Sequence, residues 1–165
     1  MTLIEDMSET QRKAWMTLLV DSFVFIYFIK ATMTGFSIDT MSPGGLAELF
    51  IGIIIVTIIL HAVIASVFEL RKRKDDEGGK DERDIAIERK GSSYGFYFLA
   101  IFLNILVGHI VLQNSVEALA SDRVSFVSVF DFNNTSHLVF ALLAAAFIGD
   151  IIKNAVMVLA YRSGE

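Results

Sequence analysis

Four long apolar runs, separated by short charged or turn-forming segments, constrain this chain more than any other feature. The runs cover 14–34, 46–70, 94–113 and 137–161, and each has the roughly 20 residues that a helix needs to cross a hydrocarbon core of about 30 Å. Backbone groups inside lipid must bond within their own segment, and none of the runs alternates as a barrel strand does. The sequence therefore predicts an all-α, polytopic membrane protein, a single transmembrane domain over 1–165 built as a bundle of four helices.

The distribution of positive charge predicts how these helices are oriented. Lys and Arg gather before the first run, between the second and third runs, and after the fourth. All three places fall on one side of the membrane, and the positive-inside rule assigns that side to the cytoplasm. We therefore expect both termini and the loop 71–93 in the cytoplasm, with outer loops at 35–45 and 114–136.

Local capping signals predict where two of the helices begin. Ser8-Glu9-Thr10-Gln11 has the pattern of a capping box, in which the Ser oxygen accepts from an early backbone amide. Asn133-Asn134-Thr135-Ser136 offers similar side chains before the fourth run. The first and fourth helices should start at these two segments.

Several function classes are excluded by what the sequence lacks. The chain has no cysteine, which excludes disulfide frameworks, thiolate metal sites and thiol catalysis. It contains no phosphate-binding glycine loop, serine elbow or His-Glu-x-x-His motif. The net charge is −5, and acids and bases lie close together, so no basic surface for direct nucleic-acid binding is indicated. We expect a protein that is not an enzyme and needs no cofactor or metal.

The cytoplasmic loop has two parts. A cationic cluster directly follows the second run, where each cation near an anionic headgroup contributes about 1 kcal/mol. The cluster is either a plain stop-transfer signal or a specific lipid or partner site, and it comprises Arg71, Lys72, Arg73 and Lys74. Two glycines then break the helix. The segment that follows has acids first and cations last, which suits a helix dipole, so we expect one long helix from about Asp81 to Gln113.

The first turns of this long helix are the predicted binding surface for a soluble partner. They should stand in the cytoplasm, where pairs among their charges are worth only about 0.3–0.5 kcal/mol each. The candidate partner-binding residues are Asp81, Glu82, Arg83, Asp84, Glu88 and Arg89.

The same segment carries a family resemblance. Asp81-Glu82-Arg83-Asp84 is followed by Ile87, Glu88, three small residues at 91–93 and Tyr94 before an apolar run. This arrangement resembles the signature of a domain-of-unknown-function family of small prokaryotic membrane proteins with four helices. The chain end Tyr161-Arg162-Ser163-Gly164 resembles that family's Tyr-Arg-Arg-Gly ending, with Ser163 in place of the second Arg.

The resemblance implies a location in the prokaryotic cell membrane, no established enzymatic activity, and a genetic association with small helix-turn-helix regulators. By analogy with that association, the leading interpretation is a membrane-embedded regulatory protein. Its cytoplasmic segment would hold a soluble transcription regulator at the membrane.

Polar side chains inside the runs each need a partner, water or a function, because a charge near the bilayer centre costs about 2.5–3.5 kcal/mol. Counting 1.5 Å of rise per residue separates them into an inner network toward the cytoplasm and an outer group. The inner network comprises Asp21, His61, Asn104, Asp150, Lys153 and Asn154, and the outer group comprises Lys30, Glu48 and His109.

Lys153 should face protein rather than lipid. Small residues recur at four-residue steps from Ala141 to Gly149 and lead to Lys153, and such a stripe lets another helix approach closely. An ion pair of Lys153 with Asp21 or Asp150 is the simplest way to neutralise these charges.

Two interpretations of the inner network remain open. The polar groups either form a proton or cation pathway, or they are internal hydrogen-bonding groups that specify helix packing. Four helices enclose little interior, so a pathway would require a homodimer, for which Gly91-x-x-x-Gly95 offers a close-packing surface. The alternative to a regulatory protein is therefore a homodimeric, proton-coupled small transporter or channel.

Overall fold

The fold is all-helical. The computed structural model describes 7–32, 43–71, 81–119, 132 and 134–163, and within these ranges it contains helices and no strand. In chain order the helices are α1 Glu9–Lys30, α2 Pro43–Arg71, α3 Glu82–Leu119 and α4 Thr135–Ser163. The prediction of four helices is confirmed, including the single long helix that begins near Asp81, but this helix ends at Leu119 rather than at Gln113.

Three of the four helices are long and apolar enough to cross a membrane. The stretches are Ala47–Val67, Glu82–Ser115 and Thr135–Ser163. The 22 residues of α1 span roughly 33 Å at 1.5 Å per residue, but α1 is not among the three and carries Lys13, Asp21 and Lys30. The structure is thus consistent with a membrane protein, and the crossing by α1 stays a prediction.

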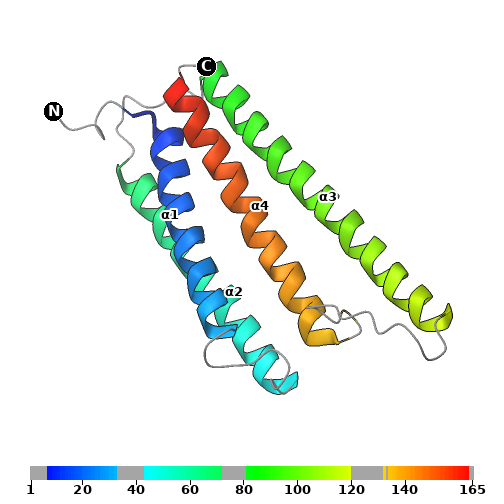
Figure 1. The fold of residues 1–165 in the computed structure, drawn as a ribbon. Helices are drawn as coiled ribbons and strands as arrows, with labels where there is room; N and C mark the ends of the chain where they lie inside the picture. Colours follow the sequence, from blue (N-terminus) through cyan, green and yellow to red (C-terminus); the bar gives the residue numbers. More distant parts are fainter. Residues whose placement is uncertain (1–6, 33–42, 72–80, 120–131, 133, 164–165) are drawn as a thin grey trace.

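The helices form an open row rather than a closed square (Figure 1). In this row α4 lies between α1 and α3, and α2 packs chiefly along α1. Neighbouring helices run in opposite directions. The start of α1, the end of α4 and the start of α3 therefore lie at the same end of the helix axes (Figure 1). We call this the common end.

Glycines let α3 and α4 approach closely. A Cβ added at Gly95 would lie 2.9 Å from the backbone oxygen of Gly149, and one added at Gly91 would lie 2.7 Å from that of Lys153. On α4, Ala141 and Gly149 are buried, as the small-residue stripe predicts. The glycine pair that the sequence suggested for a homodimer is therefore used inside the chain.

Both predicted helix caps are confirmed. Ser8 Oγ accepts the backbone N–H of Gln11 at 3.1 Å. Asn134 Oδ1 accepts the backbone N–H of Ser136 at 2.9 Å. Because free amides at a helix start need an acceptor, these side chains explain why α1 and α4 begin where they do.

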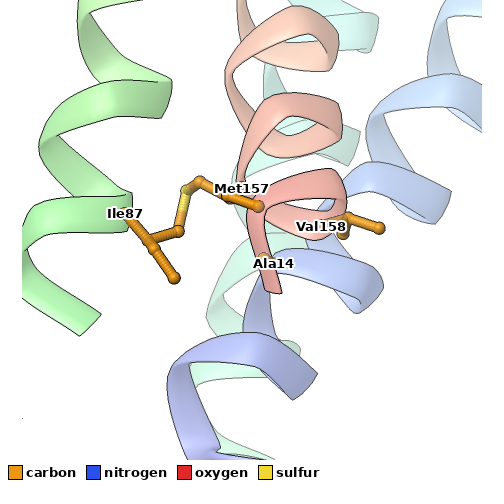
Figure 2. Packing of buried hydrophobic residues seen from close by; sticks show 5 residues of the cluster. Ala14, Ile87, Met157 and Val158 are labelled. Carbon is orange, nitrogen blue, oxygen red and sulfur yellow. The ribbon is translucent and has the colours of Figure 1, made fainter. Parts of the chain in front are cut away.

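Two apolar clusters hold the row together. At the common end, Ile87 of α3 reaches toward Met157 of α4, with Val158 and Ala14 on the side of α1 (Figure 2). We call this the end cluster. Further along, Val24, Phe28, Ile53, Phe140 and Phe147 form an aromatic cluster of α1, α2 and α4, in which the rings of Phe28 and Phe140 stack at 5.1 Å.

Much of the apolar surface of α2 and α3 is left uncovered by the chain. Ile58 on α2 is 62% exposed and Leu112 on α3 is 63% exposed, and similar side chains surround them. Patches of this extent need lipid or protein over them. This requirement agrees with the apolar stretches of α2 and α3, which are long enough to cross a membrane.

Candidate functional site

The polar contact between α1, α2 and α4 is centred on Asp21, which is 2% exposed. His61 of α2 brings Nε2 to 3.3 Å from Asp21 Oδ1. Asn154 of α4 donates from Nδ2 to Asp21 Oδ2 at 3.4 Å. Each carboxylate oxygen therefore faces a different helix, and we call these three residues the polar contact.

Two backbone carbonyls fix the orientation of the partner side chains. His61 Nδ1 lies 2.9 Å from the carbonyl oxygen of Thr57, one turn earlier on α2. Asn154 Nδ2 also donates to the carbonyl oxygen of Asp150 at 2.9 Å. The imidazole and the amide are thus tied to their own helices and are presented to Asp21 in defined directions.

The expectation that Lys153 forms an ion pair with Asp21 is wrong. In the described ranges Asp21 pairs with His61, at 3.3 Å, and Lys153 acts on Asp21 only at longer range. The reason is the rotation of α4, because Lys153 turns its backbone oxygen and Cβ toward the glycines of α3. Asn154 lies about 100° further round the helix and faces α1 instead.

Asn104 and Asp150 are also placed differently from the prediction. Asn104 is exposed on α3, where its amide donates to the carbonyl oxygen of Ala100 at 2.7 Å. Since α4 lies between α3 and α1, Asn104 does not reach Asp21. The side chain of Asp150 is exposed. Of the six predicted members, the structure brings together Asp21, His61 and Asn154.

The predicted outer group does not form one site. Lys30 ends α1, Glu48 is exposed on α2, and His109 lies on α3, at the far side of the row from α2. The ring of His109 meets that of Phe132 edge-on at 5.0 Å. His109 therefore braces the residue at 132 against α3 rather than joining Glu48.

At the common end, the first turns of α3 are fastened to both α1 and α4. Asp84 Oδ1 accepts from the hydroxyl of Tyr161 at 2.5 Å and from Ser8 Oγ at 3.3 Å. One turn further, Ile87 is 3% exposed within the end cluster. Asp84, predicted to contact a partner, is thus half-buried and engaged with the chain's own helices.

The opposite face of these turns points away from the row. Glu82, Ile85, Ala86 and Arg89 are all exposed, and their spacing of i, i+3, i+4 and i+7 places them on one face of the helix. We call this the extension face. Of the other predicted residues, Asp81 and Arg83 are exposed beside it and Glu88 is half-buried.

The cationic cluster is only partly described. Arg71 is the last residue of α2, while Lys72, Arg73 and Lys74 lie outside the described residues. Among the residues that are described, no three His, Asp or Glu side chains lie close enough together to hold a metal ion.

Comparison with known proteins gives no relative. No family model, curated protein or solved structure matches the chain. The resemblance of the Asp81–Asp84 motif to a membrane protein family therefore stays a prediction that rests on the motif and the chain end.

Sequence reasoning missed the bonds that anchor α3 at the common end. The signal was present, because Asp84, Ile87, Gly91 and Gly95 recur at steps of three and four and mark one buried face. It was hidden because the charged residues of the segment look alike in sequence, whichever side of the helix they occupy. The carbonyl of Thr57 had no signal, since any backbone carbonyl can accept a hydrogen bond.

Proposed function

We propose that this chain is a multi-pass protein of a prokaryotic cell membrane, crossing it with all four helices and keeping both termini in the cytoplasm. The apolar length of α2, α3 and α4 supports the crossings. The bias of Lys and Arg toward the common end supports the orientation. In this arrangement the extension face lies just outside the membrane, on the cytoplasmic side.

Its function, in this proposal, is to bind a soluble partner through the extension face, as a non-enzymatic regulatory protein. The partner is a cytoplasmic protein with an apolar groove, and a helix-turn-helix transcription regulator is the first candidate. Holding such a regulator at the membrane would keep it away from DNA, so binding itself would be the regulatory act.

The anchored first turns of α3 are the single observation that carries this proposal. Ile85 is 53% exposed at the centre of the extension face, while Ile87, two residues later, is buried in the end cluster. A helix that is already ordered loses little conformational freedom on binding, which favours affinity. Hydrophobic grooves recognise apolar side chains on one helical face, and Ile85 with Ala86 supplies them here.

The flanking charges add selectivity. Glu82 stands one turn before Ile85 and Arg89 one turn after it, with Arg83 exposed at the edge. A partner groove with a basic and an acidic rim in the matching order would be favoured, because opposite charges steer and orient association. Groove proteins with the reverse order would be rejected by like-charge repulsion.

Site-specific photo-crosslinking in the native cell tests this proposal. A photo-reactive amino acid in place of Ile85 should capture a soluble protein, which mass spectrometry of the crosslinked product identifies. The matched control places the same group at Ile101, which is 61% exposed on the same helix but inside the apolar run. Capture of the same soluble protein at both positions, or of none at Ile85, would contradict the proposal.

A second candidate is the homodimeric, proton-coupled transporter or channel. The contact between Asp21 and His61 favours it, because a buried carboxylate and an imidazole are the groups that exchange protons in transport proteins. Purified protein in liposomes should then carry protons, and Asp21→Asn should abolish the flux. A flux that is equal with and without the protein rules this candidate out.

A further inference from the structure

The hydrogen bonds of His61 fix how many protons the polar contact needs. The carbonyl oxygen of Thr57 can only accept, so Nδ1, at 2.9 Å, must carry a hydrogen. A neutral imidazole has one N–H, which leaves Nε2 with a lone pair. Asp21 Oδ1 lies 3.3 Å from Nε2, and an ionised carboxylate has only lone pairs. Two acceptors would face each other unless a further proton lies between them.

The second oxygen of Asp21 does not need this proton. Oδ2 already accepts from Asn154 Nδ2 at 3.4 Å. The proton therefore belongs to the contact between Oδ1 and Nε2, as an imidazolium beside a carboxylate or as a carboxylic acid beside a neutral imidazole. Both forms contain the same single proton and have the same total charge.

The charged groups around Asp21 and His61 do not replace the proton between them. On α4, Asp150 and Lys153 act on Asp21 with opposite signs, so their effects oppose each other. On α2, His61 is the titratable group that faces Asp21. Thr57 Oγ1, one turn before His61, is buried without a hydrogen-bond partner among the described residues.

We propose that Asp21 and His61 together bind one proton and that this proton fastens α2 to α1. The proton comes from water, and on release it returns to water, leaving a carboxylate beside a neutral imidazole. Neutral His61 then carries one hydrogen, either on Nδ1, which keeps the bond to Thr57 and opposes the lone pair of Nε2 to Asp21, or on Nε2, which keeps a donor to Asp21 and loses the bond to Thr57. The form that keeps the bond to Thr57 leaves α2 without a donor to Asp21, and because α2 packs chiefly along α1, that loss loosens α2 from the row. The inference goes beyond the proposed docking function and does not depend on transport.

Two variants separate the proton from the side chains that share it. Asp21→Asn puts an amide N–H where the shared proton lies, so it donates to Nε2 of neutral His61 without a titrating proton, while its oxygen still accepts from Asn154. This variant should behave as the proton-bound form throughout. Asp150→Asn is the matched control, because Asp150 is exposed and acts on Asp21 only at longer range.

The test measures the separation of α1 and α2 in lipid bilayers by electron resonance between two spin labels. The labels replace Leu19 on α1 and Ile58 on α2, both exposed, and the absence of native cysteine makes the labelling specific. As the pH is raised and the pair releases its proton, the wild-type distribution should change from one narrow distance to a broad, longer one. Asp150→Asn should do the same, and Asp21→Asn should keep the narrow distance.

Nitrogen NMR of labelled histidine provides the second readout, with the signal of His61 assigned by its loss in His61→Gln. Both ring nitrogens of His61 should carry or share a proton at low pH, and one should lose it over the range in which α2 loosens. If Asp21→Asn does not fold, His61→Gln replaces it in the spin-label measurement, because its amide also donates to Asp21 at every pH. A wild-type distance that stays constant with pH, or an Asp21→Asn variant that changes as wild type does, overturns the proposal.

Discussion

Replacing Gly95 by Ala tests the close packing of α3 on α4. This packing positions the extension face on α3 and Asn154 on α4. A Cβ at this position would lie 2.9 Å from the backbone oxygen of Gly149 and 3.3 Å from Lys153 Cβ. Ordinary contacts between heavy atoms are about 3.5 Å, so the two helices would have to separate locally by roughly half an ångström. Neither neighbour is the end of a flexible side chain, and no rotamer change relieves the clash.

The expected loss of stability follows from two opposing effects. Overpacking of a well-packed contact costs about 1–3 kcal/mol, while Ala favours a helix over Gly by about 1 kcal/mol. Gly108→Ala is the matched control, because Gly108 lies on the same helix and a Cβ there meets nothing within 4 Å. The helix preference is common to both variants, so Gly95→Ala should be less stable than Gly108→Ala by about 1–3 kcal/mol.

The assay is reversible unfolding of the purified protein in mixed micelles of a mild detergent and sodium dodecyl sulfate. Trp15, the single tryptophan, packs against the end cluster, so its fluorescence reports the packing of α1, α3 and α4. Gly91→Ala should also be destabilising, because its Cβ meets the backbone oxygen of Lys153 at 2.7 Å. Equal free energies of unfolding for Gly95→Ala and Gly108→Ala would refute the packing argument.

Two further predictions concern the common end and the topology. Tyr161→Phe removes the hydroxyl that donates to Asp84 at 2.5 Å, a bond to a charged acceptor worth about 1.5–3 kcal/mol, so amides in the first turns of α3 should exchange hydrogen faster. Exposed Tyr94→Phe should leave the exchange unchanged, and equal protection in both variants would refute the anchoring role. If α1 crosses the membrane, a membrane-impermeant thiol reagent should label Lys30→Cys in intact cells but label Lys13→Cys only after permeabilisation. Labelling of both from the same side would show that α1 does not cross.

The helices were predictable because their signals are local. An apolar run of fixed length and a Ser or Asn that caps the first amides act within a few residues. The run 46–70 corresponds to α2 at Pro43–Arg71, and the helix expected from about Asp81 corresponds to α3 at Glu82–Leu119. The meeting of Asp21 and His61 was also predictable, since the fixed rise per residue puts them at similar levels of their helices, and the structure joins them.

The pairing of side chains was not predictable, because it depends on which helices are neighbours and how each is rotated. Lys153 and Asn154 differ by one residue, yet one faces the glycines of α3 and the other faces Asp21 on α1. Asn104 lies on a helix that α4 separates from α1. The order of helices in the row is set by contacts far apart in sequence, such as Phe28 with Phe140, which a single sequence does not reveal.

The measurement that tests the central claim most directly is recovery of a soluble partner with the tagged protein, purified in mild detergent from its native cell. Arg83→Glu reverses a charge beside the extension face, and Lys13→Glu makes the same change at an exposed position of α1 near the common end. Quantitative mass spectrometry should find one soluble protein with wild type and with Lys13→Glu, and should find it depleted with Arg83→Glu. Equal recovery with all three proteins, or no soluble protein with wild type, would contradict a docking function for the extension face.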